Sequence, residues 1–117
     1  MVKTERIRFS NIQEEITYHI GKSKSDNFTV IDMASAKDLW FHVSDESSCH
    51  VVCIVPTGLN KKQTMTLIKK GGELCKQNTS KFRGKTVEIT YTFVENVKKT
   101  DIVGCVYVSG AKKIEIR

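Results

Sequence analysis

The segment that most constrains the fold is TVEITYTF, residues 86–93, because its apolar and polar side chains alternate. The apolar positions are Val87, Ile89, Tyr91 and Phe93. Successive side chains of a β-strand point to opposite faces of a sheet. The alternation therefore predicts a strand with one buried and one solvated face, which is typical of an antiparallel sheet.

Six further segments are expected to add strands to this sheet. They lie at residues 16–20, 28–31, 39–43 and 50–55 and in the C-terminal stretches VGCVYVS and KIEI. The first two are expected to form a hairpin, because the GKSKSDN connection between them is rich in residues that favour turns. The MASAKD segment that follows suits a short helical turn.

One principal helix is expected over residues 60–78. Asn60 can cap its start, and Gln63, three residues later, completes a capping-box pattern. An apolar stripe follows at helical spacing, formed by Met65, Ile68, Gly72 and Cys75. Gly71 and Gly72 each cost about 1 kcal/mol relative to Ala inside a helix. Their presence predicts that the helix lies very close to the sheet.

These elements predict an α+β fold, a mainly antiparallel sheet with one principal helix packed on it. The 117 residues are expected to form a single domain, spanning 1–117. The N-terminal MVKTERIRFSN lacks the apolar core of a secretory signal, and no apolar run approaches the ~20 residues of a membrane span. A cytoplasmic protein without a membrane partner is expected, with its four cysteines as reduced thiols.

The strand DLWFHV, residues 38–43, places Asp38, Trp40 and His42 on the face opposite its aliphatic residues. Trp40 could stack on a nucleobase, with His42 beside it as a hydrogen-bond donor. Alternatively the sheet is covered on both faces, Trp40 belongs to the core, and the two polar residues hold local backbone. The sequence leaves both interpretations open.

Neither a metal centre nor a catalytic site is expected. Cys49 and Cys53 would lie about 13 Å apart along a strand, too far to share one zinc ion. The same spacing separates Asp38 from His42, and no oxyanion hole or substrate pocket is evident. The chain is expected to need no cofactor and to be no enzyme.

Basic residues concentrate in the second half of the chain. Residues 1–57 carry 6 Lys/Arg against 8 Asp/Glu, and residues 58–117 carry 13 against 5, a balance of −2 against +8. This asymmetry favours a polyanionic partner, either nucleic acid or an acidic surface. A general solubilising charge is the alternative.

Several of these motifs together resemble one known family. They are Gly21 and Lys22, Asp38, Trp40 and His42, Ser48 and His50, Tyr91 and Thr92, Lys98 and Lys99, and Gly104 and Val106. Over residues 16–116 the chain resembles the NFACT-R domain, the RNA-binding part of NFACT proteins, which act in ribosome-associated quality control of translation. It is most similar to the small stand-alone eukaryotic members, but lacks the coiled-coil tail into which those usually continue.

The resemblance implies a non-enzymatic RNA-binding domain on the ribosome, with ribosomal RNA, the large subunit or tRNA as partner. The motif residues are Asp38, Trp40, His42, Ser48 and His50. The residues expected to contact nucleic acid are Trp40, His42, His50, Lys81, Arg83, Lys85, Lys98, Lys99, Lys112 and Lys113. The lysines are expected to gather on one side of the sheet and bind phosphates. An adaptor for an acidic protein and a DNA-binding module remain alternatives.

Overall fold

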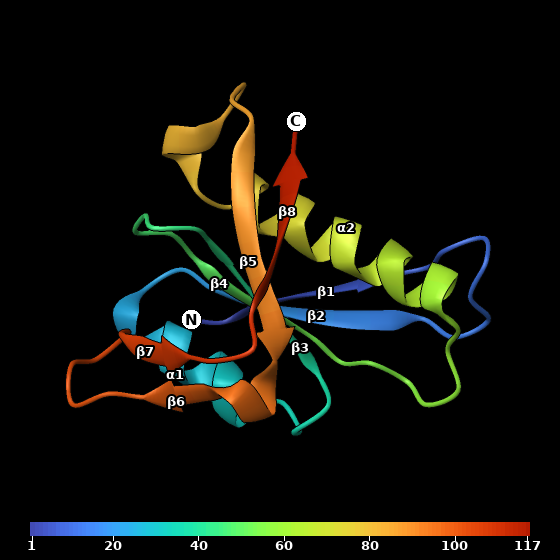
Figure 1. Cartoon of the computed structure of the whole chain (residues 1–117), viewed down its shortest axis with the longest axis horizontal. Coiled ribbons are helices and arrows are strands. Elements are labelled where there is room, and N and C mark those ends of the chain that lie inside the picture. The colour runs from blue at the N-terminus through green and yellow to red at the C-terminus, as the bar shows by residue number, and fades with distance from the viewer.

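A six-stranded antiparallel sheet forms the centre of the computed structural model, which describes residues 1–117 (Figure 1). Its strand order is β1-β2-β4-β3-β5-β8. The strands are β1 (Lys3–Ile7), β2 (Ile16–Gly21), β3 (Leu39–Val43), β4 (His50–Cys53), β5 (Val87–Phe93) and β8 (Lys112–Ile116). A separate two-stranded ribbon is formed by β6 (Val97–Lys99) and β7 (Val106–Val108).

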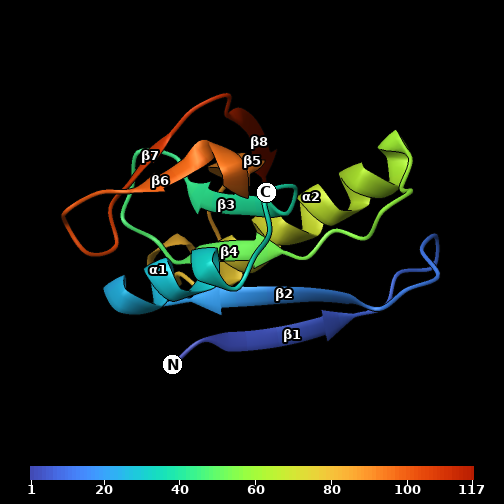
Figure 2. The same ribbon diagram turned by 90° about the horizontal axis from the view of Figure 1, so that it is seen from below.

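Both faces of the sheet are covered. Helix α2 (Lys61–Gln77) packs on one face, and helix α1 (Lys24–Asp32) lies with the β6–β7 ribbon on the other, as Figure 2 shows from the α1 side. Two 3₁₀ turns, η1 (Ser80–Phe82) and η2 (Val94–Asn96), follow α2 and β5. The predicted α+β class is confirmed, with a second helix that the sequence analysis did not anticipate. Neither helix has the length and apolar character needed to cross a membrane.

The expected capping box and the close packing of α2 are both present. The Asn60 side chain accepts a hydrogen bond from the Gln63 amide, and the Gln63 side chain accepts one from the Asn60 amide. A Cβ atom built on Gly71 would lie 2.2 Å from Cζ of Phe41. A Cβ on Gly72 would lie 2.9 Å from Cγ1 of Ile116. The two glycines therefore let α2 approach β3 and β8.

Gly71→Ala is expected to destabilise the domain by about 2 kcal/mol, although alanine favours helix by about 1 kcal/mol. The physical reason is that the Phe41 ring is fully buried and cannot yield to the new methyl group. Gly72→Ala is the matched control, because the flexible end of the Ile116 side chain can rotate away. We expect it to stay within about 1 kcal/mol of wild type in urea unfolding. Equal losses for the two variants would contradict this account.

Trp40 belongs to a small second core between the sheet and α1. Only 2% of the residue is exposed, and it packs with Val30, Val52, Val94 and Val97. The opposite face of β3 packs under α2 in the larger core. The interpretation of β3 as a two-sided core strand is therefore correct. A nucleobase has no exposed face of Trp40 on which to stack.

The predicted strand at 28–31 is wrong, because these residues lie in α1. Ser23 caps this helix, and its hydroxyl accepts a hydrogen bond from the Asp26 amide. The alternation in FTVI is short, and the local capping interaction together with burial of Val30 and Ile31 favours the helix. MASAKD forms the turns that lead from α1 into β3.

Two other sequence expectations need correction. At the end of β5 the pattern inverts, so that Thr92 is buried and Phe93 is 43% exposed. The reason is that the Thr92 hydroxyl donates to the Ser109 carbonyl beside the β6–β7 ribbon. Cys105 is exposed in a turn before β7 and does not lie within an apolar strand. Strands β1 and β6 were not predicted.

Candidate nucleic-acid interface

Two adjoining pockets form a groove beside the C-terminal end of β3. Their volumes are about 410 and 370 Å³, and they share Lys24, Asn27, Ser47 and Ser48. The walls come from the start of α1, the β3–β4 connection, the segment before β7 and the residues that follow α2, which all lie toward the left of Figure 1. We call this the histidine groove, defined by Lys22, Lys24, Asn27, His42, Ser48 and Lys81.

Three aromatic rings form the floor of the histidine groove. The Trp40 and His42 rings are stacked with centroids 5.7 Å apart, and the His50 ring stands edge-on to both, at 5.2 and 4.9 Å. Trp40 Nε1 donates to His50 Nδ1 at 3.3 Å. His50 is only 2% exposed, whereas His42 is half-buried. Of the three predicted contact residues on these strands, His42 alone presents substantial surface, and Trp40 and His50 hold it in place.

Polar side chains from neighbouring elements fix the walls. The buried Asn27 side chain accepts from the His50 amide at 3.1 Å, which ties α1 to β4. The Ser48 hydroxyl accepts from the Val43 amide and donates to the Cys49 carbonyl. The β3–β4 connection is thus held by hydrogen bonds to its own backbone, which gives the groove a preformed wall.

Both groove histidines are neutral at pH 7. Burial lowers the pKa of His42, and burial together with the neighbouring His42 lowers the pKa of His50 to about 3. Because Trp40 donates to Nδ1 of His50, the single imidazole proton of His50 is on Nε2. The positive charge of the groove is therefore supplied by lysine, and the imidazole of His42 offers hydrogen bonding without charge.

Acid is expected to destabilise the domain through His50. The unfolded chain binds a proton near pH 6.5 and the folded chain only near pH 3, so stability is complete above about 6.5 and falls as pH drops below it. His50 alone is expected to cost about 2–3 kcal/mol between pH 7.5 and pH 4.5. Urea unfolding at the two pH values measures this loss. In His50→Gln the free energy of unfolding should fall less between the two pH values than in wild type. An equal loss in wild type and His50→Gln would show that His50 is not the group that makes stability depend on pH.

Asp38 stabilises the backbone rather than the groove. Its Oδ2 accepts from the Ser35 amide at 2.7 Å and its Oδ1 from the Val55 amide at 2.9 Å. The residue is buried and does not line either pocket. This placement agrees with the alternative in which Asp38 holds local backbone, and it separates Asp38 from His42 in role.

Three lysines line the histidine groove. Lys22 and Lys24 are exposed and make no salt bridge, whereas Lys81 lies 3.7 Å from Glu46, the one acid of the lining. Arg83 and Lys85 follow Lys81 beyond η1, are exposed and have no acidic partner. Of the predicted Lys81, Arg83 and Lys85 cluster, Lys81 alone lines the groove.

The remaining predicted lysines lie elsewhere. Lys98 is exposed on the β6–β7 ribbon, while Lys99 is bound to Asp32 at 2.6 Å. Lys112 and Lys113 are on β8, where Lys113 lies 3.4 Å from Glu88. Five further lysines belong to α2 on the other side of the sheet, namely Lys61, Lys62, Lys69, Lys70 and Lys76. The expectation that the lysines gather on one side is wrong, because α2 and the β6–β7 ribbon cover opposite faces.

The sequence analysis missed Lys24 and Asn27 as site residues, and it used Lys22 only as a motif residue. All three were assigned to a hairpin connection. The available signal was Ser23 followed by Asp26, a pattern that marks the start of a helix. Reading it would have placed both lysines at a helix N-terminus.

Groups that could support metal binding are not found together. No cluster of three or more His, Cys, Asp or Glu side chains has the geometry to hold a metal ion. All four cysteines are free, and the Cys49 and Cys75 sulfurs lie 3.8 Å apart beneath the groove.

A preformed, lysine-rimmed groove on an α+β sheet has the charge that suits a polyanion. The comparisons with known proteins name the class. The family model described as "NFACT protein RNA binding domain" matches residues 7–115. The chain belongs to this family, which is one of RNA-binding domains and not of enzymes, so RNA is the class of partner that it implies.

Individual relatives agree with this assignment. The chain is 32% identical over 94 residues to "Coiled-coil domain-containing protein 25 homolog" of Dictyostelium discoideum, covering 79% of this chain and 46% of the relative. It is 32% identical over 93 residues to "Coiled-coil domain-containing protein 25" of Danio rerio, covering 72% and 42%. The chain thus spans less than half the length of these curated relatives.

A solved structure shares the fold. The C-terminal part of the fibronectin/fibrinogen-binding protein from Streptococcus suis superimposes with a TM-score of 0.77 at 20% sequence identity. The match covers 97% of this chain and 45% of that chain. It supports the arrangement of the sheet and helices described above.

Proposed function

We propose that this domain binds structured RNA on the ribosome, either ribosomal RNA of the large subunit or ribosome-bound tRNA, without acting as an enzyme. The histidine groove is the primary contact. Its lysines bind backbone phosphates, and His42 donates or accepts one hydrogen bond with a nucleotide at the centre. On this proposal the protein works in the cytoplasm, in translation and its quality control.

The observation that carries the proposal is the position of Lys22 and Lys24 around the first turn of α1. The free amides of a helix N-terminus already favour an anion, and these two side chains add two unpaired positive charges on the groove wall. Asp26 is occupied by the N-terminal amine at 2.7 Å, so its charge is compensated. An anion at this wall meets lysine and amide donors together.

Lys98 lies on the outer face of the ribbon beside the groove. The β6–β7 ribbon adjoins the start of α1, since a Cβ on Gly104 would lie 3.0 Å from the Lys24 backbone. Lys98 faces solvent opposite Tyr107, which is 73% exposed. Lys98 and Tyr107 point to the face of the ribbon opposite Val106 and Val108, which line the groove. An RNA would therefore meet Lys98 only by extending over the outer face of the ribbon, whereas the α2 lysines lie on the other side of the sheet.

Salt dependence of binding tests the proposal. If about four phosphates are contacted, affinity for a structured RNA should fall roughly 150-fold between about 50 and 200 mM salt. Fluorescence anisotropy with a labelled hairpin measures this fall, and sedimentation with large ribosomal subunits tests the location. Tighter binding to duplex DNA would favour a DNA-binding module. Absence of RNA binding, with salt-sensitive binding to an acidic protein, would favour an adaptor.

A further inference from the structure

We propose that a second groove, on the α2 side of the sheet, holds an unpaired base of the bound RNA. This inference rests on the proposed function and assigns it a second contact. The aromatic groove is defined by Lys61, Met65, Tyr91, Phe93 and Lys112 and has a volume of about 470 Å³. It lies between the start of α2 and strands β5 and β8 (Figure 1).

The aromatic groove exposes apolar surface that the fold does not cover. Phe93 is 43% exposed and Met65 39% exposed, although each belongs to the apolar set of its own element. Tyr91 is half-buried, and its ring stacks on the buried Phe41 ring with centroids 6.2 Å apart. Phe41 thus supports Tyr91 from the core, so the aromatic surface is rigid before any ligand arrives.

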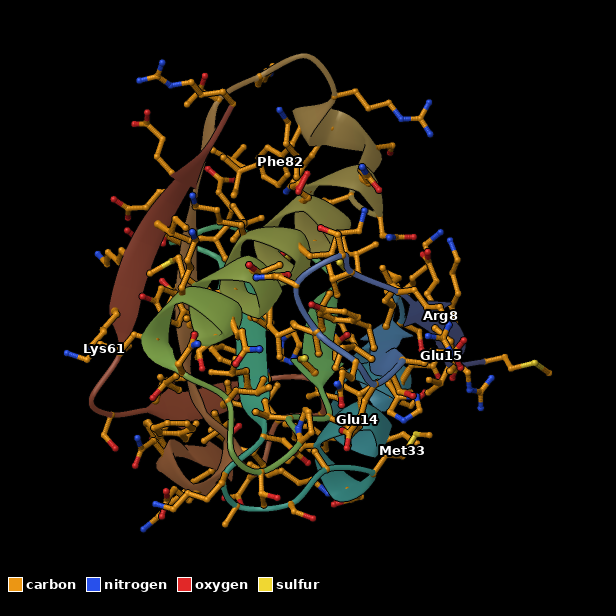
Figure 3. All side chains as sticks on the ribbon, turned by 90° about the vertical axis from the view of Figure 1, so that its right-hand side faces the viewer. Arg8, Glu14, Glu15, Met33, Lys61 and Phe82 are labelled. Carbon is orange, nitrogen blue, oxygen red and sulfur yellow. The ribbon has the colours of Figure 1, made fainter.

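The charged side chains that line the aromatic groove are all lysines. Lys61 and Lys112 are exposed at its rim and make no salt bridge, and no acidic side chain lines it. Figure 3 shows Lys61 extending away from the body of the protein at the start of α2. Lys37 lies over the Phe93 ring at 5.5 Å and is itself bound by Glu95, so it stays with the ring.

An occupant must therefore combine a flat or apolar part with negative charge. A nucleotide has both, because its base can stack on aromatic rings while its phosphate meets lysine. Stacking on aromatic side chains does not depend on base identity, which suits a groove without a dense set of hydrogen-bond donors. An acidic peptide with an apolar side chain is the other class of occupant, and the experiment below distinguishes it.

One RNA can reach both grooves. Leu39 lines the aromatic groove and His42 the histidine groove, and the two are three positions apart on β3. At ~3.3 Å per residue the separation along the strand is about 10 Å. Because Leu39 and His42 point to opposite faces of the sheet, a single-stranded extension must pass around the sheet edge, over a path longer than this separation, to place a base on Phe93.

Two labelled RNAs and three variants test this inference by anisotropy. The RNAs are a blunt hairpin and the same hairpin with an unpaired 3′ extension of uridines. Phe93→Ala is expected to weaken binding of the extended RNA about tenfold and to leave the blunt hairpin unchanged. Phe93→Trp should retain the affinity, and Met33→Ala, at an exposed position just after α1, is the matched control. An extension of abasic sites should behave like the blunt hairpin.

The outcomes separate the two proposals. If wild type binds both RNAs equally and Phe93→Ala changes neither, the aromatic groove is not a base site and the proposed function stands. If an acidic peptide binds and Phe93→Ala abolishes that binding but leaves RNA binding intact, the groove belongs to a protein partner and the inference is overturned. If wild type binds neither RNA, both proposals fail. A 4-thiouridine in the extension that crosslinks to the β5 peptide would support the inference directly.

Discussion

Replacing Lys22 and Lys24 together by glutamate is expected to lower affinity for structured RNA about 100-fold at moderate salt. Each substitution removes an attraction to phosphate and adds a repulsion, worth about 1–2 kcal/mol for each lysine near a solvated surface. Folding should be preserved, because an acid at the first turn of a helix interacts favourably with its dipole. Anisotropy titration measures the affinity, and thermal unfolding verifies the fold.

The matched control is Lys62→Glu with Lys69→Glu on α2. It changes the net charge by the same amount on two exposed side chains, but on the face away from the histidine groove. The affinity of this variant for RNA should fall only a few-fold, because the substitutions weaken the overall electrostatic attraction between the protein and RNA. An equal loss in both double variants would show that RNA responds to net charge alone, and the histidine groove would no longer be the primary contact.

Asp38→Ala is expected to reduce the free energy of unfolding by about 3 kcal/mol or more. The carboxylate accepts from two part-buried backbone amides, of Ser35 before β3 and Val55 after β4. Without it both amides lose their partner, and each such loss costs about 1–3 kcal/mol. Urea unfolding measures the effect. Asp38→Asn retains one acceptor oxygen, so its free energy of unfolding should lie between those of Asp38→Ala and wild type.

RNA binding distinguishes a structural Asp38 from a contact residue. The folded fraction of Asp38→Ala should bind structured RNA with nearly wild-type affinity, because Asp38 lines neither groove. A loss of affinity comparable to that of the Lys22 and Lys24 variant, without a loss of stability, would show that Asp38 acts in binding. The Asp-x-Trp-x-His motif would then be a single site.

The three residues of the motif Asp38, Trp40 and His42 do not share one role. Asp38 stabilises the backbone and Trp40 the second core, while His42 lies in the histidine groove, stacked on Trp40. The sequence analysis could list these alternatives but not choose between them. The choice depends on what covers the second face of the sheet, namely α1, which contributes Val30 from just before β3, and the β6–β7 ribbon, which contributes Val97 from far beyond β3 in the chain.

Much of the α2 face of the fold follows from local patterns in the sequence. The capping box at Asn60 and Gln63, the two helix glycines and the alternation at the start of β5 each depend on near neighbours, so they could be predicted without the fold. The family could also be identified from short motifs. The predicted pairing of residues 16–20 with 28–31 failed, because capping by Ser23 favours a helix at that position.

By itself, the sequence determined the α+β class, the position of α2 and the charge that suits a polyanion, because these depend on spacing and composition. Where the charged side chains lie relative to one another depends on how the helices pack on the sheet. Lys22 and Lys24 meet His42 because α1 crosses the sheet beside β4, and the lysines of α2 are separated from them by the sheet itself. Contacts between residues distant in the chain follow from packing, which no local pattern encodes.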